Sequence, residues 1–226
     1  MLVKNWMNPN VTTIDKDESL QQAMKLMKHH HIKMLPVMKK GKLVGVVTDR
    51  DIKRASASDA TLLEIHELMY LLAEIKIEEI MTSEPITVPP DYTVEETAEI
   101  LFKNDISGVP VMDGTRKIVG TITKTDLFRV LISLTGFGAR GIQFALIVED
   151  RPGSIKEVAD IIRGYSGRMA SILSTYENVA EGFRKVYIRM YEIDRARLAL
   201  LKEDIRKKAT LLYLVDHRNN LREIYS

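Results

Sequence analysis

One short stretch occurs twice in this chain and limits how the chain can fold. Residues 45–51 read Gly-Val-Val-Thr-Asp-Arg-Asp, and residues 120–126 read Gly-Thr-Ile-Thr-Lys-Thr-Asp. Both are apolar runs that end in Thr-x-x-Asp, and they lie 75 residues apart (126 − 51 = 75). Further features repeat at an offset of 74, among them Met7 with Met81 and Pro36 with Pro110. Such a duplication predicts two similar half-domains packed about a pseudo-two-fold axis, with a cleft between them that holds two related sites.

The repeated Thr-x-x-Asp has two interpretations. A threonine at a helix N-cap accepts a backbone N–H from the first turn, and a carboxylate three residues later bonds back to the cap. The same hydroxyl and carboxylate can instead hold the two hydroxyls of a ribose, with phosphates drawn to the helix N-terminus. The motif alone leaves both interpretations open.

Each half is expected to follow the order β-α-β-β-α. In the first half, Ser19 and Gln22 form a capping-box pattern that follows a short β-prone run at 11–14. Strands are expected at 34–38 and 43–47, and a helix from Thr48 or Asp49. The second half repeats this scheme, with Thr93 and Glu96 in the capping positions. Between the halves, residues 55–77 contain no Gly or Pro and predict a long helix with a wide apolar face.

The last third of the chain reads as a separate domain. Three glycines within 133–141 mark the boundary. After them the pattern predicts strands at 142–148, 169–176, around 186–190 and at 211–215, with helices after Ser154 and Asp194. The resulting order is β-α-β-β-α-β, a ferredoxin-like arrangement, so the whole chain is expected to be a mixed α+β protein.

Composition excludes several classes of protein. The chain has 226 residues, a formal net charge of +2 and no cysteine. The charge gives no reason to expect nucleic-acid or membrane binding, and disulfides and thiolate chemistry are excluded. No signal-peptide pattern or membrane-length apolar run is present, which favours a cytoplasmic protein. The consecutive His29, His30 and His31 point in different directions on a helix, which disfavours metal binding.

Residues 1–135 resemble a tandem pair of CBS domains, known as a Bateman module. The resemblance rests on Met-Thr-x-x-Pro at 81–85, on Ser-Gly-Val-Pro-Val at 107–111, and on the two Gly-x-x-Thr-x-x-Asp runs. Such modules are regulatory and commonly bind AMP, ADP, ATP or S-adenosylmethionine. The resemblance implies ribose contacts from the two Thr–Asp pairs and adenine contacts from the neighbouring strands. The implied nucleotide-binding residues are Thr12, Met34, Leu35, Pro36, Thr48, Arg50, Asp51, Arg54, Ile86, Ser107, Gly108, Val109, Pro110, Thr123, Lys124 and Asp126.

The two halves differ around these sites. Gly108 allows a ring to approach the backbone closely, whereas its counterpart Met34 adds bulk. The first half carries more cationic residues near the expected phosphate position, which suits phosphate unless they are simply solvated. We therefore expect unequal sites, with the second half forming the better adenine pocket.

The Asp-Arg-Pro-Gly turn at 150–153 resembles the ACT domain. ACT domains bind amino acids or other small effectors at this turn, usually between paired domains. The resemblance implies an effector site at Asp150, Arg151, Pro152, Gly153 and Ser154, in which the amides of Gly153 and Ser154 take a carboxylate and Asp150 takes an ammonium. The alternative is a plain β–α turn in a domain that only dimerises.

The expected organisation is CBS domain 1 at 1–57, a linker helix at 58–78, CBS domain 2 at 79–135, a Gly-rich linker at 136–141 and an ACT domain at 142–226. This order resembles bacterial regulators of the acetoin-utilisation protein B type. We expect a non-catalytic, homodimeric regulator that senses an adenine nucleotide and acts on another protein. The alternatives are a ligand-free scaffold or an enzyme, but His66 and His217 are isolated and no phosphate-binding loop or metal motif is present.

Overall fold

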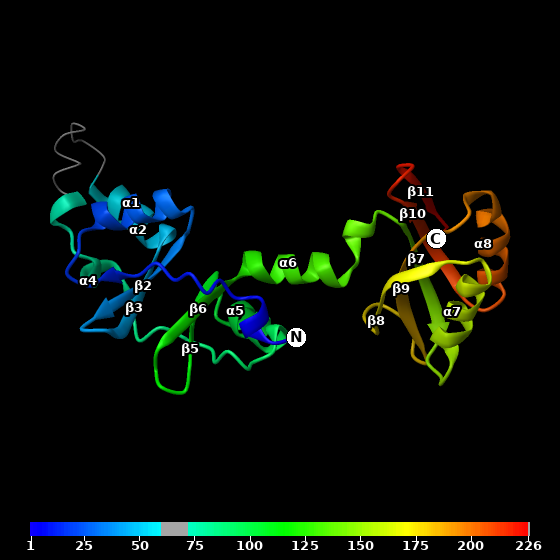
Figure 1. Ribbon diagram of the computed structural model, residues 1–226, viewed down its shortest axis with the longest axis horizontal. Coiled ribbons are helices and arrows are strands. Elements are labelled where there is room, and N and C mark those ends of the chain that lie inside the picture. The colour runs from blue at the N-terminus through cyan, green and yellow to red at the C-terminus, as the bar shows by residue number, and fades with distance from the viewer. Residues whose placement is uncertain (60–71, 226) are drawn as a thin grey trace. The chain divides into compact units, whose positions relative to one another are not determined.

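The computed structural model of the protein describes residues 1–59 and 72–225 (Figure 1). The chain forms two compact units, Met1–Phe128 and Arg129–Ser226. Most of the helix predicted for 55–77 lies outside the described residues. No helix in the described part of the chain is long and apolar enough to cross a membrane.

The first repeat has the predicted order of elements. Its strands are β1 (Ile14–Asp15), β2 (Met34–Lys39) and β3 (Lys42–Thr48), and its helices are α1 (Leu20–His30) and α2 (Asp49–Asp59). Ser19 caps α1 by accepting the amide of Gln22 at 3.2 Å. The structure therefore confirms the predicted cap, although β1 is shorter than the β-prone run suggested.

The second repeat has the same arrangement, with α5 (Val94–Lys103), β5 (Gly108–Met112), β6 (Ile118–Thr123) and α6 (Lys124–Leu134). Thr93 and Glu96 form a complete capping box: the amide of Glu96 donates to the Thr93 hydroxyl at 3.1 Å, and the amide of Thr93 donates to the Glu96 carboxylate at 2.7 Å. Val88 bridges in parallel to Val111, as Ile14 in β1 pairs with Val37. The repeat read from the sequence is thus present in the backbone pairing.

The two repeats exchange the segments that precede them. The start of the chain, including η1 (Val3–Asn5), joins the second repeat: the amide of Val3 donates to the carbonyl of Tyr92 at 2.8 Å, and Asn8 bridges to Thr121. In the same way α4 (Ile77–Ile80) and β4 (Thr82–Ser83) join the first repeat, where Thr82 pairs with Val46 of β3. Each repeat is therefore completed by a segment that precedes the other repeat in the chain.

Two glycines make this exchange possible. A Cβ at Gly45 would lie 2.6 Å from the sulfur of Met81 and 2.9 Å from the carbonyl oxygen of Thr82. At the matching position of the second repeat, a Cβ on Gly120 would lie 3.1 Å from the carbonyl oxygen of Asn8 and closer still to the side chain of Met7. The exchanged segments therefore pack directly against backbone that has no side chain.

The second unit has one antiparallel sheet with the strand order β11-β10-β7-β9-β8. Its strands are β7 (Ile142–Glu149), β8 (Arg168–Thr175), β9 (Phe183–Tyr191), β10 (Thr210–Asp216) and β11 (Leu221–Ile224), and its helices are α7 (Ser154–Gly164) and α8 (Leu198–Arg206), with short turns η2 (Phe137–Ala139) and η3 (Arg195–Arg197). The predicted β-α-β-β-α-β order is present. β11 is an addition that the sequence reading did not include.

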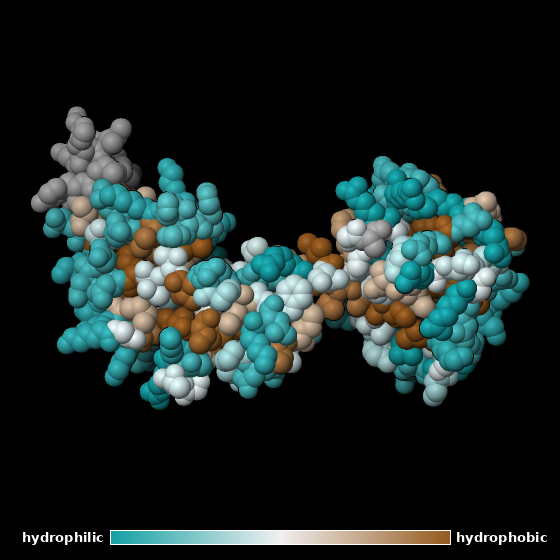
Figure 2. Space-filling model, viewed as in Figure 1, coloured by the Kyte–Doolittle hydropathy of each residue, from teal (hydrophilic) through white to brown (hydrophobic). Residues whose placement is uncertain are grey.

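Both helices of this unit cover one face of the sheet (Figure 1). The core contains alternate residues of β7 and β9, such as Phe144, Leu146 and Ile188, together with Val158 and Ile162 of α7. This alternation is what a sheet with one buried face requires. Polar side chains cover most of the visible surface of each unit, with hydrophobic residues between them (Figure 2).

Candidate functional site

The first Thr–Asp pair, Thr48 and Asp51, lies where β3 ends and α2 begins. The carboxylate oxygen Oδ2 of Asp51 accepts the backbone amide of Thr48 at 2.9 Å and its hydroxyl at 2.6 Å. The amide of Asp51 in turn donates to the Thr48 hydroxyl at 3.4 Å. The other carboxylate oxygen, Oδ1, accepts Nη2 of Arg54 at 3.3 Å. Thr48 and Asp51 therefore cap α2 reciprocally, and the carboxylate oxygen that is not used in the cap faces the guanidinium of Arg54.

The second Thr–Asp pair, Thr123 and Asp126, has nearly the same geometry at the start of α6. Oδ2 of Asp126 accepts the Thr123 amide at 2.9 Å and its hydroxyl at 2.7 Å, and the Asp126 amide donates to that hydroxyl at 3.4 Å. The Asp126 side chain is 9% exposed. A buried carboxylate and hydroxyl held together at a helix N-terminus can accept and donate to the vicinal hydroxyls of a ribose.

The strand register brings the adenine candidates next to these pairs. Met34 of β2 pairs with Thr48, and Gly108 of β5 pairs with Thr123. The amide of Lys124 donates to the carbonyl of Ser107 at 2.8 Å, and in the first half the amide of Asp49 donates to the carbonyl of Lys33 at 3.0 Å. Each helix N-terminus is thus tied to the residue that precedes the strand.

The remaining candidates divide into buried and surface groups. Leu35, Pro36, Val109 and Pro110 are buried in the strands, so only their backbone can face a ligand. Arg50 and Ile86 are exposed, and Thr12 is half-buried before β1. Lys124 lies 3.8 Å from Asp105, a weak surface ion pair that leaves the ammonium accessible to a phosphate.

Gly108 and Met34 make the two halves unequal. A Cβ at Gly108 would lie 2.9 Å from the methyl carbon of Thr123 and 3.0 Å from the carbonyl oxygen of Ile122. A side chain at this position would therefore crowd Thr123 itself, so a glycine is required beside the second Thr–Asp pair. In the first half the side chain of Met34 occupies the matching register position.

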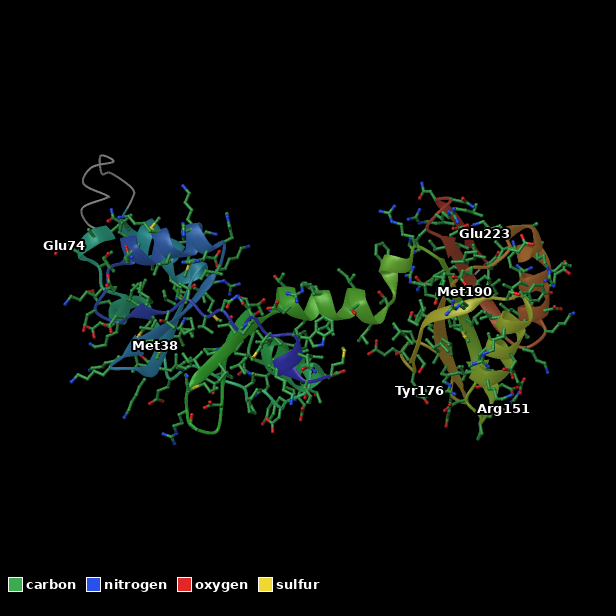
Figure 3. All side chains as sticks on the ribbon, viewed as in Figure 1. Met38, Glu74, Arg151, Tyr176, Met190 and Glu223 are labelled. Atoms are coloured by element: carbon green, nitrogen blue, oxygen red, sulfur yellow. The ribbon has the colours of Figure 1, made fainter. Side chains whose placement is uncertain are left out.

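The turn after β7 forms a compact polar cluster at the end of the second unit. The guanidinium of Arg151 donates to Glu149 at 2.8 Å and to Glu157 at 2.7 Å, which raises the pKa of Arg151 and lowers the pKa of Glu157. Arg151 lies at the opposite end of the unit from Glu223 of β11 (Figure 3). Asp150 is 3.5 Å from Nε of Arg184 and accepts the Tyr176 hydroxyl at 3.4 Å, so its carboxylate is already engaged.

The start of α7 carries the other half of this cluster. Gly153 has φ +91°, the left-handed region that suits glycine, and it is the N-cap of the helix. Ser154 is 5% exposed, and its hydroxyl oxygen is buried without a hydrogen-bond partner. A buried hydroxyl without a partner at a helix N-terminus is costly, and a ligand carboxylate or a water molecule there would satisfy it.

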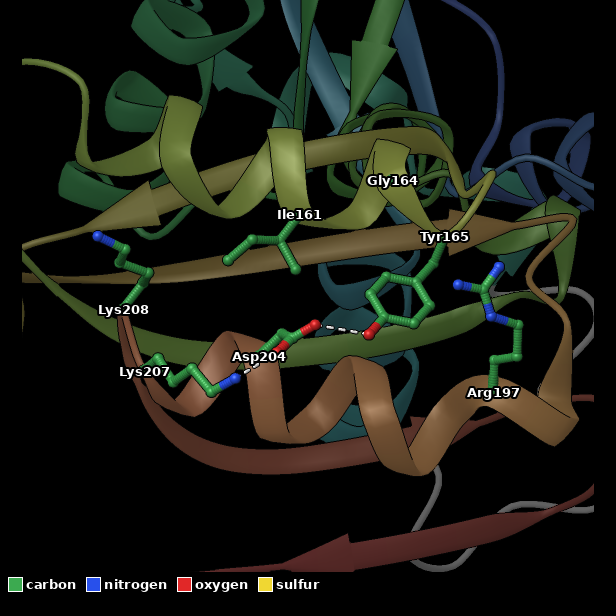
Figure 4. Close-up of a pocket in the computed structure, with 7 residues that line it drawn as sticks. All are labelled: Ile161, Gly164, Tyr165, Arg197, Asp204, Lys207 and Lys208. Atoms are coloured by element: carbon green, nitrogen blue, oxygen red, sulfur yellow. Dashed lines mark hydrogen bonds and ion pairs between the residues drawn. The ribbon is translucent and has the colours of Figure 1, made fainter.

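A shallow hollow of about 410 Å³ lies between α7 and α8 (Figure 4). The Tyr165 hydroxyl donates to Asp204 at 2.6 Å, and Lys207 donates to the other oxygen of that carboxylate at 2.7 Å. These bonds raise the pKa of Tyr165 and lower the pKa of Asp204. The Arg197 guanidinium stacks 4.6 Å from the centre of the Tyr165 ring. Sequence reasoning missed this cluster, whose polar groups pair with one another and join the two helices.

Among the described residues no group of three or more His, Asp or Glu side chains is placed to hold a metal ion. His217 packs edge-on against Phe137 at 5.1 Å, and its pKa is lowered, first by burial and then by Arg189. His66 lies outside the described residues.

Comparison with known proteins identifies relatives of the N-terminal unit. The CBS domain family model matches residues 3–58 and 77–133, half of the chain. A CBS domain-containing protein of Dictyostelium discoideum is 31% identical over 135 residues, which cover 59% of this chain and 93% of that protein. The match to L-aspartate semialdehyde sulfurtransferase of Methanocaldococcus jannaschii is 35% identical over 130 residues but covers only 23% of that enzyme.

A solved structure shares both the fold and much of the sequence of this region. It is the CBS domain pair of protein MJ0100, crystallised in complex with 5′-methylthioadenosine and S-adenosyl-L-methionine. It is 35% identical, with a TM-score of 0.50, and the match covers 58% of this chain and 95% of that structure. The chain therefore belongs to the CBS-domain family and carries two CBS domains in tandem.

Proposed function

We propose that this protein is a non-catalytic regulator whose CBS pair binds an adenosine-containing ligand: AMP, ADP, ATP or S-adenosylmethionine. The observation that supports this most strongly is the presence of two Thr–Asp pairs with matching geometry at equivalent strand–helix junctions. Each pair offers a hydroxyl and a carboxylate beside the strand that is proposed to contact the adenine, β2 in the first half and β5 in the second. The related MJ0100 pair, which was crystallised with two adenosine compounds, supports the same ligand class.

The second half is the proposed principal site. Gly108 carries no side chain beside Thr123, and Asp126 is the more buried of the two carboxylates. The first half, with Met34 and the exposed Arg50 and Arg54, suits a ligand with more phosphate and a less tightly held base. Two unequal sites are the expected result.

We further propose that the C-terminal unit is an ACT-type domain. The order of its strands β10-β7-β9-β8, with both helices on one face, supports a ferredoxin-like arrangement. The buried hydroxyl of Ser154 beside Gly153 supports a small carboxylate effector at the start of α7. Since Asp150 already faces Arg184 and Tyr176, an effector ammonium would have to share that carboxylate.

Homodimerisation belongs to the same proposal. The edge strand β8 has no charged residue between Met169 and Thr175, and an edge without charges favours pairing with another strand. In the CBS unit Phe102 is 83% exposed, where its counterpart in the first repeat is Lys28. These two features support association into a dimer. The proposal that the dimer acts on a further protein in the cytoplasm, in a context such as acetoin utilisation, is supported by the resemblance of the domain order alone.

Thermal unfolding of the full chain tests the proposal against the scaffold alternative. Each ligand is added separately, in large excess over the protein: AMP, ADP, ATP, NADH and S-adenosylmethionine. A ligand present at about 100 times its dissociation constant stabilises the folded state by about 2.7 kcal/mol. At least one adenosine compound is expected to raise the melting temperature by several degrees. If none does, the CBS pair is a scaffold.

The same assay with the twenty amino acids tests the effector site. A small amino acid is expected to raise the melting temperature, and Ser154→Ala is expected to reduce that shift. Ser166→Ala, at an exposed serine beyond the other end of α7, is the matched control and leaves the shift unchanged. If no amino acid shifts the transition, the domain serves dimerisation alone.

A further inference from the structure

Arg189 of β9 is an unusual residue in the second unit because it is a buried cation. Its side chain is 5% exposed, and within the described residues no carboxylate forms an ion pair with it. One guanidinium nitrogen, Nη1, is buried without a hydrogen-bond partner. Burial lowers the pKa of Arg189, although an arginine remains charged at any ordinary pH. A buried charge of this kind needs compensation from its surroundings.

The compensation comes from the end of helix α6. Nε of Arg189 donates to the carbonyl oxygen of Thr135, the residue directly after α6, at 2.7 Å, and Nη2 donates to the side-chain oxygen of Gln143 at 2.6 Å. The C-terminal end of a helix carries a partial negative charge from its unpaired carbonyl groups. The helix end therefore supplies partial negative charge to the guanidinium.

A second donor holds the same carbonyl. The hydroxyl of Ser171 in β8 donates to the carbonyl oxygen of Thr135 at 2.8 Å. Two neighbouring strands thus bind one backbone atom at the end of α6. The amide of Thr135 still donates to the carbonyl of Leu131 at 3.0 Å, so this residue continues the hydrogen bonding of the helix.

The residues that follow are fixed along the same sheet. Gly136 has φ +61° and lies so close to Ala170 that a Cβ would be 2.8 Å from the alanine side chain. The ring of Phe137 lies 5.4 Å from the Arg189 guanidinium and contacts His217 edge-on. The amide of His217 donates to the carbonyl of Gly141 at 3.2 Å. Residues 135–141, which include the predicted linker 136–141, are held against the sheet, and we call them the strap.

We propose that Arg189 is a positioning residue that clamps the end of helix α6 to the C-terminal sheet. The guanidinium needs the helix end as its counter-charge, and the helix end needs donors for its last carbonyl groups. Loss of the helix end would leave the buried guanidinium without this acceptor, and loss of Arg189 would leave the Thr135 carbonyl with Ser171 as its remaining donor, so both changes weaken the attachment of the strap. This clamp is independent of whether the CBS pair binds a nucleotide.

Hydrogen exchange of the full chain, followed by mass spectrometry, tests the clamp. In the wild type the amides of Thr135 and Gly136 donate to carbonyls of α6 and the amide of Arg140 donates to Phe137, and all three are expected to exchange slowly. Arg189→Met removes the charge and both hydrogen bonds, and exchange of residues 135–141 is expected to rise at least tenfold. Exchange of β7 and β10 is expected to stay as in the wild type, because their core residues are untouched.

Three further variants separate the clamp from a general loss of stability. Arg168→Met removes the same charge from an exposed site on β8 and should leave the strap protected. In Arg189→Lys the ammonium can donate to the Thr135 carbonyl but cannot also donate to Gln143 with the geometry of a guanidinium. The exchange rate of the strap is therefore expected to lie between those of the wild type and Arg189→Met. Ser171→Ala removes only the second donor and should raise exchange by less than Arg189→Met. The clamp is wrong if folded Arg189→Met leaves the strap as protected as in the wild type. If Arg189→Met does not fold, the same result for both Ser171→Ala and Arg189→Lys overturns the clamp. An equal rise over β7 and β10 also overturns it.

Discussion

Asp126 accepts hydrogen bonds from both the backbone amide and the hydroxyl of Thr123, at 2.9 and 2.7 Å. The matching distances between Asp51 and Thr48 in the first half are 2.9 and 2.6 Å. The cap and the ribose interpretations of the motif are therefore compatible. The cap positions the hydroxyl and the carboxylate at the helix N-terminus, and a ribose would bind the same two groups by sharing their lone pairs.

Replacing Gly120 or Gly45 with alanine should destabilise the CBS unit. The new Cβ would collide with the exchanged segment of the other repeat, including a backbone carbonyl oxygen that cannot rotate away. Overpacking of this kind costs about 1–3 kcal/mol. Chemical denaturation monitored by circular dichroism measures the change. Gly114→Ala is the control, because nothing lies within 4 Å of a Cβ there. Equal stability of all three variants would disprove the packing described for Met7 and Met81.

Gly108→Met should give the second half the same residue that the first half has at Met34, and should weaken ligand binding there. The side chain would crowd the backbone beside Thr123, where an added Cβ is already 2.9 Å from the threonine methyl carbon. Titration calorimetry with S-adenosylmethionine is expected to show at least tenfold weaker binding at one site, with the other site unchanged. Gly114→Met controls for the added side chain. Unaltered binding by Gly108→Met would mean that the adenine does not lie against β5.

Acid should weaken the second unit through Asp216. This carboxylate is 1% exposed, and hydrogen bonds from Arg195 at 2.7 and 3.1 Å lower its pKa. A group whose pKa is lowered by folding contributes stability above its unfolded pKa, about 3.9, and loses it as the pH falls through the folded value. Asp216→Asn is therefore expected to cost about 1.5–3 kcal/mol at pH 7, as the loss of hydrogen bonds to a charged group does, because the Arg195 side chain is 32% exposed and stays hydrated.

The difference between the wild type and Asp216→Asn should begin to shrink as the pH drops below about 4, where the unfolded carboxyl is protonated, and it should be lost below the lowered pKa of the folded wild type. Denaturation midpoints measured from pH 7 to pH 2.5 show this convergence. Asp194→Asn, at an exposed cap, is the matched acidic control. Its free energy of unfolding should stay within a few tenths of a kcal/mol of the wild-type value at each pH. A constant difference across the whole range would contradict the role given to Arg195.

Local sequence patterns were sufficient for much of the fold. Ser19 and Thr93 predicted helix starts because capping involves residues three apart, and both caps are present. The alternation of Val186, Ile188 and Met190 with polar residues predicted β9 and its buried face. The repeat predicted the likeness of the two halves, because one backbone arrangement imposes the same residue types twice.

Long-range contacts were beyond such patterns. Nothing near Met7 in the sequence indicates that it covers Gly120, because the exchange depends on how two half-domains pack. The partners of Arg189 lie 46 and 54 residues away, so its burial could not be read from its place in an alternating strand. The glycines at 136–141 predicted a linker at a domain boundary, and the pattern did not indicate that two of them allow close contact with β8 and β9.

Calorimetric titration of the full chain with AMP and S-adenosylmethionine tests the central claim most directly. Wild type, Asp51→Ala, Asp126→Ala and the double variant are compared, with Asp113→Ala in a surface turn of the second half as the control. Thermal unfolding of each variant first establishes that it is folded, and Asp126→Asn replaces Asp126→Ala if that variant is not.

Removal of a charged hydrogen-bond acceptor costs about 1.5–3 kcal/mol, or roughly 10–100-fold in affinity. Asp126→Ala is expected to weaken the tighter site by this factor, Asp51→Ala to affect only the weaker site, and the double variant to lose both. Asp113→Ala should bind as the wild type does. If folded Asp126→Ala and the double variant bind every adenosine compound with wild-type affinity, the two Thr–Asp pairs are helix caps and the proposed sites are wrong.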